Sequence, residues 1–355
     1  MKELCGLLPR HIRSVSPFSA LPSYRTDQLL HWIYRRHAPD YCNMSSLPPS
    51  LREELSQHFA YPLLQLQAVE ETEDRETTKF LWQLPDRQKV ESVWIRSSHR
   101  RTLCLSSQVG CKARCSFCAS GKRGWIRHLT AAEIVEQIVH VSRYADQYRE
   151  HISHLVFMGM GEPLDNYDHL IRALELIADE QTFHLSTRRV TISTVGVIEN
   201  IYRLAKEKLS PNLAISLHAP NQKLRQKLIP YARLYPLEEL LKAADDYTDR
   251  TGREITYEYI LLSKINDRKE HAYELASLCQ GRQCCVNLIP YNPVKGVNMR
   301  RSNTQEIDRF RAILHQCKVR NTQRYTKGRT INAACGQLAY QAQSLENKRE
   351  GDDVL

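Results

Sequence analysis

Short apolar runs alternate with amphipathic stretches from residue 101 to about residue 290. The apolar runs have the length of buried strands, whereas the stretches between them repeat apolar residues at the spacing of one helix face. We predict strands over residues 102–105, 154–158, 189–194, 212–217, 255–262 and 285–289. We predict helices over residues 131–144, 164–178, 198–208, 237–251 and 268–278.

Six strand–helix units in succession predict parallel strands that are joined by right-handed crossovers. The expected fold is therefore α/β, a partial (βα)6 barrel, because a complete eight-fold barrel needs more units than the chain offers. In such folds the loops after the strands lie together at the carboxyl edge of the sheet. Functional residues are expected in these loops, around a single mouth.

The region before the barrel has a different pattern. Residues 24–58 read as short helices, in which Thr26 and Asp27 are expected to cap a helix over 28–36 and Ser50 to start another. Residues 80–96 alternate as strands do. We expect a helical accessory domain that contacts RNA over residues 1–85, the barrel over 86–330, and a C-terminal segment over 331–355 that frays after Gln343.

Three cysteines follow the first predicted strand at C-x-x-x-C-x-x-C spacing, as Cys111, Cys115 and Cys118. Three thiolates on one loop can hold an iron–sulfur cubane, but they leave one iron without a protein ligand. An open position is typical of a catalytic metal site rather than a structural one. Structural zinc is less favoured, because it usually takes two cysteine pairs or a cysteine pair with a histidine pair.

Polar residues also fall at the ends of the other predicted strands. Gly159 and Gly161 are expected to let a ligand approach the backbone, and Glu162 to bind the ammonium of an amino-acid-like ligand. The remaining strand-end residues suit hydrogen bonds to a ribose or a carboxylate: Ser193, Ser216, His218 and Asn292. Each residue alone could be a turn or a strand cap, so their predicted co-location is the argument for a site.

The composition narrows the class of partner. In 355 residues with 42% hydrophobic content, 50 Lys+Arg against 40 Asp+Glu give a formal charge of +10. Such an excess favours a polyanion such as nucleic acid, although mild basicity can also be a solubility feature. The basic residues that cluster near the predicted mouth are Lys112, Arg114, Lys122, Arg123, Arg127, His128, Arg300, Arg301, Arg320, Arg324, Lys327 and Arg329. We expect a cytoplasmic protein with reduced thiols and no membrane association, since no membrane-length apolar run or signal sequence is evident.

In combination, five motifs resemble the radical S-adenosylmethionine (SAM) superfamily and, more closely, the RNA adenine methyltransferases RlmN and Cfr. The motifs occupy residues 104–111, 158–163, 216–220, 289–293 and 332–338, so the resemblance extends to about Leu338. It implies a [4Fe-4S] cluster on Cys111, Cys115 and Cys118, whose open iron binds the amino and carboxylate groups of SAM.

The resemblance also implies a role for individual residues. The SAM pocket would be lined by Gly161, Glu162, Ser193, Ser216, Leu217, His218 and Asn292. Cys335 would carry a methyl group, Cys104 would release it by forming a disulfide with Cys335, and Glu91 would accept a proton. Two SAM molecules would be used per turnover, one to methylate Cys335 and one to start the radical chemistry.

The implied function is methylation of C2 of an adenosine in 23S rRNA, with tRNA as a further substrate. The alternative is Cfr-like methylation of C8, because Lys327 to Asn332 replace the acidic stretch that commonly precedes Ala-Ala-Cys in C2-methylating members. An electron donor such as flavodoxin or ferredoxin and a monomeric state are expected. A non-enzymatic RNA-binding protein with a structural metal would not account for Glu162 or Cys335, and a glycyl-radical activase would lack the Cys104 and Cys335 pair.

Overall fold

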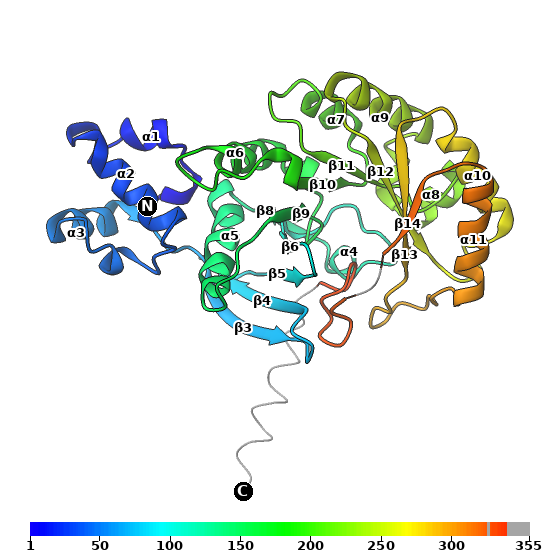
Figure 1. Ribbon diagram of the computed structural model, residues 1–355, viewed down its shortest axis with the longest axis horizontal. Helices are drawn as coiled ribbons and strands as arrows, with labels where there is room; N and C mark the ends of the chain where they lie inside the picture. Colours follow the sequence, from blue (N-terminus) through cyan, green and yellow to red (C-terminus); the bar gives the residue numbers. More distant parts are fainter. Residues whose placement is uncertain (325–326, 339–355) are drawn as a thin grey trace, which may run out of the picture.

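A mixed β-sheet forms the centre of the molecule in the computed structural model, which describes residues 1–324 and 327–338. Within these residues the sheet has ten strands in the order β14-β13-β12-β11-β10-β9-β6-β5-β4-β3 (Figure 1). Its parallel part consists of β6 (Arg101–Cys104), β9 (His154–Phe157), β10 (Val190–Thr194), β11 (Asn212–Ser216), β12 (Ile255–Leu261), β13 (Cys284–Pro290) and β14 (Asn321–Gln323). The predicted frayed tail after Gln343 lies outside the described residues.

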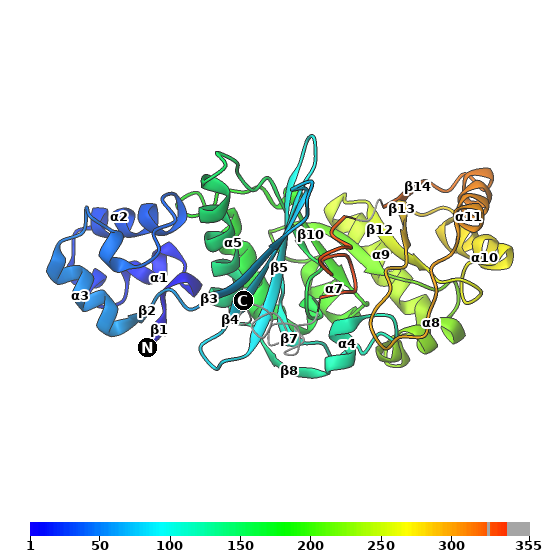
Figure 2. The same cartoon turned by 90° about the horizontal axis from the view of Figure 1, so that it is seen from below.

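Helices connect the parallel strands and cover the outside of the curved sheet (Figure 2). They are α5 (Ala131–Asp146), α6 (Tyr167–Ala178), α7 (Ile198–Leu204), α8 (Gln222–Leu228), α9 (Leu237–Thr251), α10 (Lys269–Cys279) and α11 (Thr304–Gln316). Because one face of the sheet is packed under these helices, the opposite face is left to line the barrel interior. Among the described residues, every helix is too short or too polar to cross a bilayer.

The predicted α/β partial barrel is confirmed, and the six predicted strands are present. The structure adds β14, whose three residues Asn321, Thr322 and Gln323 pair in parallel with β13. This strand was not predicted because it contains no apolar residue. A helix was predicted to start at residue 164, whereas residues Pro163–Asn166 form the 3-10 turn η4 and α6 begins at Tyr167.

Three antiparallel strands extend the sheet beyond β6, namely β3 (Gln65–Glu71), β4 (Thr77–Gln83) and β5 (Lys89–Arg96). Phe80 of β4 and Trp94 of β5 are buried against Tyr144 of α5, with ring centroids 5.0 and 6.2 Å apart. The predicted domain boundary at residue 85 falls inside the β4–β5 hairpin. Strand pairing therefore favours a boundary before Gln65.

The helical unit at the N-terminus contains α1 (Pro9–Arg13), α2 (Ser23–Tyr34) and α3 (Pro49–His58). The predicted cap of α2 was wrong: the helix begins directly after Pro22, so Thr26 is buried within it. α3 begins at Pro49, one residue before the predicted Ser50, because the fixed φ of proline suits the first turn of a helix.

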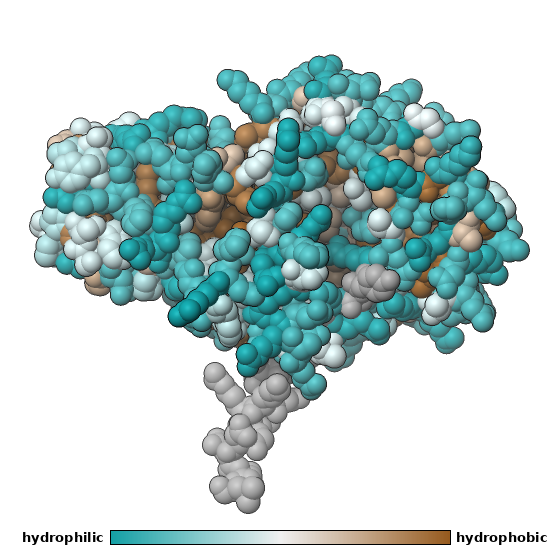
Figure 3. All heavy atoms as spheres, viewed as in Figure 1, coloured by the Kyte–Doolittle hydropathy of each residue, from teal (hydrophilic) through white to brown (hydrophobic). Residues whose placement is uncertain are grey.

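Short elements complete the fold. They are β1 (Lys2–Glu3), which pairs with β2 (Phe59–Ala60), the hairpin of β7 (Gln108–Gly110) and β8 (Trp125–His128), helix α4 (Ala119–Arg123), and the 3-10 turns Leu4–Gly6, Phe18–Ala20, Tyr41–Asn43, Thr187–Arg189 and Pro230–Arg233. The face shown in Figure 3 is mostly hydrophilic, and hydrophobic residues show mainly in its hollows. This distribution agrees with a core that is buried under the helices.

The helical unit is fastened to the barrel by polar contacts with α5. The Glu136 carboxylate accepts hydrogen bonds from the amides of Leu63 and Leu64 at 2.6 and 3.0 Å. Arg143 donates to the carbonyls of His37 and Ala38 at 2.6 and 2.8 Å. The Glu136 contacts fix the linker between the two parts, and the Arg143 contacts hold the loop that follows α2.

Replacing Glu136 by alanine should loosen this linker. The Leu63 and Leu64 amides would lose their acceptor, and each unsatisfied buried amide costs about 1–3 kcal/mol. We therefore expect E136A to melt at a clearly lower temperature and to be cleaved by chymotrypsin in the linker, after Phe59. E53A, which removes an exposed carboxylate from α3, is the control. Equal melting of E136A and the unmodified protein would contradict this role.

Candidate functional site

Several predicted site residues lie on the interior face of the sheet, at paired positions of neighbouring strands. Val93 pairs with Cys104, and Cys104 pairs with Val156, so these three side chains share one face. Because side chains alternate along a strand, Glu91 lies on the same face as Cys104. The pairing continues through β10, β11 and β12, and it places on this face Ser193, Ser216 and Glu258.

The cysteine loop (residues 111–118) is held on three sides. The Cys111 amide donates to the Gly124 carbonyl at 3.0 Å, which ties the loop to the β7–β8 hairpin. The Ser116 amide donates to the Leu228 carbonyl at 2.9 Å, at the end of α8. The Phe117 ring meets the His218 ring edge-on at 4.9 Å. The loop is thus fixed against the carboxyl ends of the strands, where the sequence predicted it.

The donor set of the loop fits an iron–sulfur cluster. Burial raises the pKa of the Cys111, Cys115 and Cys118 thiols, so the metal-free side chains are neutral and would release protons on binding iron. Within residues 1–324 and 327–338, no three His, Cys, Asp or Glu side chains are grouped to hold one metal ion. A cubane does not need three side chains that converge on one ion, because each thiolate binds a separate iron.

The two glycines after β9 have a packing role that was not predicted. A Cβ on Gly159 would lie 2.6 Å from the Leu105 carbonyl oxygen. A Cβ on Gly161, whose φ is +110°, would lie 2.7 Å from the Gln108 amide nitrogen. Both glycines therefore allow close packing of this turn on the protein's own segment 105–108. The predicted approach of a ligand to their backbone stays a prediction.

Glu162 is buried and oriented by backbone donors. Its Oε1 accepts from the Leu164 amide at 3.0 Å, and its Oε2 accepts from the Val195 amide at 2.7 Å. Burial raises the pKa of Glu162 to about 7, although both backbone hydrogen bonds favour the carboxylate. Each oxygen keeps a second lone pair, so the group can still accept a hydrogen bond from an ammonium.

Three further predicted residues gather beside the cysteine loop. The hydroxyls of Ser193 and Ser216 are 3.5 Å apart. His218 Nδ1 accepts from the Ile260 amide at 3.1 Å, and burial lowers the pKa of His218 to about 3. The imidazole is therefore neutral with its proton on Nε2, which makes it a donor. The Leu217 amide already donates to the Glu258 carbonyl at 3.1 Å, so the predicted backbone contact would have to use its own carbonyl.

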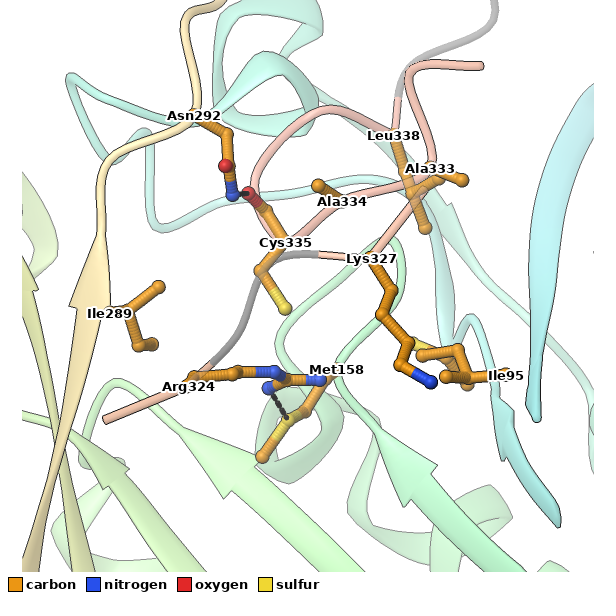
Figure 4. Close-up of a pocket in the computed structure, with 11 residues that line it drawn as sticks. Ile95, Met158, Ile289, Asn292, Arg324, Lys327, Ala333, Ala334, Cys335 and Leu338 are labelled. Atoms are coloured by element: carbon orange, nitrogen blue, oxygen red, sulfur yellow. Dashed lines mark hydrogen bonds between the residues drawn. The ribbon is translucent and has the colours of Figure 1, made fainter. Parts of the chain in front are cut away.

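A cavity of about 200 Å³ contains both Cys104 and Cys335, and we call it the two-sulfur cavity (Figure 4). Its lining comes from distant parts of the chain: Ile95, Cys104, Met158, Ile289, Asn292, Arg324, Lys327, Ala333, Ala334, Cys335 and Leu338. Figure 4 shows the Cys335 side chain directed toward Arg324 and Met158. Arg324 Nη1 donates to Met158 Sδ at 3.6 Å. The structure thus brings the two predicted sulfur residues together.

Arg324 acts electrostatically on both sulfurs. The pKa of Cys104 is raised to about 12, mainly by burial and also by the neighbouring Cys335, while the Arg324 guanidinium opposes both effects. The pKa of Arg324 is itself raised, with Cys335 as the largest cause. Arg324 was predicted to be one of the basic residues near the mouth that favour a polyanionic partner, and the structure places it in the lining of the two-sulfur cavity.

The C-terminal segment (residues 327–338) carries Cys335 and is anchored to the cysteine loop. The Ala119 amide donates to the Gly336 carbonyl at 2.8 Å, directly after Cys118. Asn292 Nδ2 donates to the Cys335 carbonyl at 3.3 Å, while Asn292 Oδ1 is buried without a partner among the described residues. That oxygen is available to a ligand.

Glu91 lies on the face of Cys104 but is not among the residues that line the two-sulfur cavity. Its Oε1 is 3.5 Å from Lys79 Nζ, and its Oε2 is buried without a partner in the described part of the chain. Burial raises the pKa of Glu91, and the Lys79 ammonium opposes this effect. Lys79 also donates to the Ile331 carbonyl at 2.8 Å, so it joins Glu91 to the C-terminal segment.

The sequence analysis missed Lys79, Arg225 and Glu258. Lys79 and Glu258 are buried charges inside strands, and a charge within an apolar run is the signal that could have revealed them. Glu258 accepts a hydrogen bond from Asn287 Nδ2 at 2.8 Å, and burial raises its pKa. Arg225 lies in the short polar helix α8, where no sequence pattern marks it as buried.

Comparisons with known proteins agree with this geometry. Residues 105–276 match the radical SAM superfamily, and residues 20–60 match the ribosomal RNA large subunit methyltransferase N-terminal domain. A protein of Protochlamydia amoebophila, named probable dual-specificity RNA methyltransferase RlmN 2, is 51% identical over 332 residues, which cover 94% of this chain and 91% of that protein. The probable RlmN of Dictyoglomus turgidum is 41% identical over 350 residues, which cover 99% of both chains.

A solved structure shows the same fold over nearly the whole chain. The crystal structure of a radical SAM methyltransferase from Sphaerobacter thermophilus superposes with a TM-score of 0.93 at 40% sequence identity. The match covers 95% of this chain and 99% of the other. The chain therefore belongs to the RlmN family of radical SAM RNA methyltransferases.

Proposed function

We propose that this enzyme methylates C2 of an adenosine in 23S rRNA and also acts on tRNA. The observation that carries the proposal is the two-sulfur cavity, in which Cys104 and Cys335 lie beside the cysteine loop. Relatives named dual-specificity RNA methyltransferases support two RNA substrates, and the N-terminal match supports large-subunit rRNA. Analysis of the product must distinguish methylation of C2 from Cfr-like methylation of C8.

C2 of adenine is electron-poor and has no lone pair with which to take a methyl group by simple displacement. Cys111, Cys115 and Cys118 would hold a [4Fe-4S] cluster, which would supply one-electron chemistry for the cleavage of SAM. The protein's own task is to hold SAM and the base in a dry site. The buried oxygens of Glu162 and Asn292 would accept hydrogen bonds from the amino group and the ribose of SAM. The neighbouring hydroxyls of Ser193 and Ser216 would add further hydrogen bonds.

Cys335 would act first as a nucleophile. Its sulfur takes the methyl group of SAM, so that a carbon–sulfur bond forms as the sulfonium bond breaks. This displacement requires a thiolate. The Cys335 side chain is directed toward Arg324, whose guanidinium would balance the negative charge of such a thiolate (Figure 4). The methyl group is then carried on the C-terminal segment, next to the cysteine loop.

Release of the product would need a second thiol and a base. The methyl group on Cys335 must first lose one hydrogen atom to the radical derived from the second SAM, and its carbon then bonds to the adenine ring. Glu91 would take the ring proton. The Cys104 thiolate would then attack the Cys335 sulfur, so that a disulfide forms as the sulfur–carbon bond breaks, the released carbon takes up a proton to become the methyl group, and one electron is given back. A reductant must return both residues to thiols, the state in which they are found among the described cysteines.

The partners follow from the same arrangement. A target base has to leave its stack to reach a cavity of about 200 Å³. We propose that the helical unit before residue 61 and the exposed side chains of Lys112 and Arg114 contact the RNA backbone. An electron donor such as flavodoxin or ferredoxin would reduce the cluster. We propose a cytoplasmic monomer, because the whole site is built from one chain.

Methylation of RNA fragments tests the function directly. Anaerobic incubation of the reconstituted enzyme with isotopically labelled SAM and either 23S rRNA or tRNA should place the label on C2 of adenosine. Mass spectrometry of the digested nucleosides distinguishes C2 from C8. A C111A variant serves as the control, because it should lose the cluster and the product. Label on C8, or none on adenosine, would overturn the proposal.

Removing Lys79 should change the pH dependence of product release. Burial already raises the pKa of Glu91, and loss of the opposing Lys79 charge would raise it further. Because Glu91 must be deprotonated to act as a base, the acid limb of the rate should move to higher pH. We expect the single-turnover rate of K79M to fall roughly tenfold on the acid limb of the pH profile and to change little on the alkaline plateau. A fall of this size is what the loss of one nearby opposite charge should cause.

K79R is the matched variant for this test, because it keeps the positive charge. It should retain the acid limb of the unmodified enzyme. If K79M and K79R lose rate equally at every pH, Lys79 only holds the C-terminal segment and Glu91 is not the base.

A further inference from the structure

Arg225 is a charged side chain at the centre of the protein. It lies in α8 and is 0% exposed. One guanidinium nitrogen, Nη2, donates to the Val195 carbonyl, whereas Nε and Nη1 have no partner among the described residues. A buried cation with unused donors is costly unless an anion balances it. The site therefore fits an anionic group that faces this guanidinium.

The cysteine loop supplies that group. Cys115 packs against the same buried cluster as Val195, which Arg225 holds, and Leu228, which ends its helix. In this setting the guanidinium and the Cys115 sulfur each favour the charged form of the other, although burial dominates the pKa of both groups. The carbonyl of Leu228, at the end of the same helix, accepts from the Ser116 amide at 2.9 Å. α8 and the cysteine loop thus form one packed unit, and Arg225 is buried within it.

Val195 links Arg225 to the SAM-binding carboxylate. Its amide donates to Glu162 Oε2 at 2.7 Å, while its carbonyl accepts from Arg225. Holding the Val195 carbonyl needs only one donor, which a smaller or neutral side chain could provide. Packing alone therefore does not explain why the other two guanidinium nitrogens, Nε and Nη1, are buried as charged donors.

We propose that Arg225 is a positioning residue that faces the anionic cluster on the Cys115 side and raises its reduction potential. The inference rests on the proposed cluster at Cys111, Cys115 and Cys118. Reduction adds one negative charge to a group that three thiolates already make anionic. A fixed cation in a medium of low dielectric constant stabilises the reduced form, and donors near the sulfurs act in the same direction.

The midpoint potential of the cluster tests this role without any RNA. Unmodified protein, R225Q, R225K and the control R250Q would be reconstituted anaerobically and titrated with EPR detection. Arg250 is an exposed arginine of α9 that pairs with Asp246 at 2.8 Å. Iron and sulfide content, SAM affinity of the oxidised protein and melting of the metal-free protein would be measured in parallel.

R225Q should keep its fold and become at least tenfold harder to reduce at a given potential, which is about 59 mV for one electron. R250Q should match the unmodified protein, and R225K should lie between it and R225Q. Metal-free R225Q should melt no lower than the metal-free parent, because it lacks the buried unpaired charge. Loss of iron from R225Q but not from R225K would also support charge balance.

Other outcomes would overturn the proposal. An unchanged potential with full iron content would show that the charge does not act on the cluster. Equal loss of iron from R225Q and R225K would indicate a structural contact to Val195. A fall in SAM affinity at unchanged potential would assign Arg225 to the SAM carboxylate instead. None of these readouts depends on which RNA carbon is methylated, so failure here is distinct from failure of the proposed function.

Discussion

The anchoring of the C-terminal segment to the cysteine loop is the constraint on which the site depends. Cys104 belongs to the first parallel strand, and Cys335 lies far along the chain, yet both line one cavity. The Ala119 amide, one residue after Cys118, holds the Gly336 carbonyl at 2.8 Å. A methyl group on Cys335 would therefore stay beside the place where SAM is cleaved. This contact therefore joins the methyl carrier to the proposed site of SAM cleavage.

Buried cations shape the rest of the site. Burial raises the pKa of the Glu91 carboxyl group and of the Cys104 and Cys115 thiols, and so favours their neutral forms. Each has a positive neighbour that opposes burial: Lys79, Arg324 and Arg225 respectively. This pairing explains how a largely apolar interior can hold groups that must become charged. Membership of an RNA methyltransferase family also excludes the non-enzymatic metal protein that the cysteines alone would have allowed.

The sequence predicted those parts of the fold that local physics determines. Apolar runs marked the six strands, whereas β14 was missed because Asn321–Gln323 has no apolar side chain. The strand-end positions of Glu162, Ser193 and Ser216 followed from topology. The packing role of Gly159 did not, because it depends on the Leu105 carbonyl of another strand. Cys335 was found only through its family motif, since nothing in its spacing from Cys104 predicts contact.

The most direct test of the central claim, that Cys335 carries the methyl group and Cys104 releases it, is a covalent trap. C104A should form the bond between Cys335 and adenine but fail to break it, so RNA should remain attached to the protein at Cys335. Denaturing gels and mass spectrometry of the RNA-linked peptide would detect the adduct. C317A, at an exposed cysteine, should release methylated RNA normally. Release of methylated RNA by C104A, or an adduct that persists in C104A/C335A, would contradict the account.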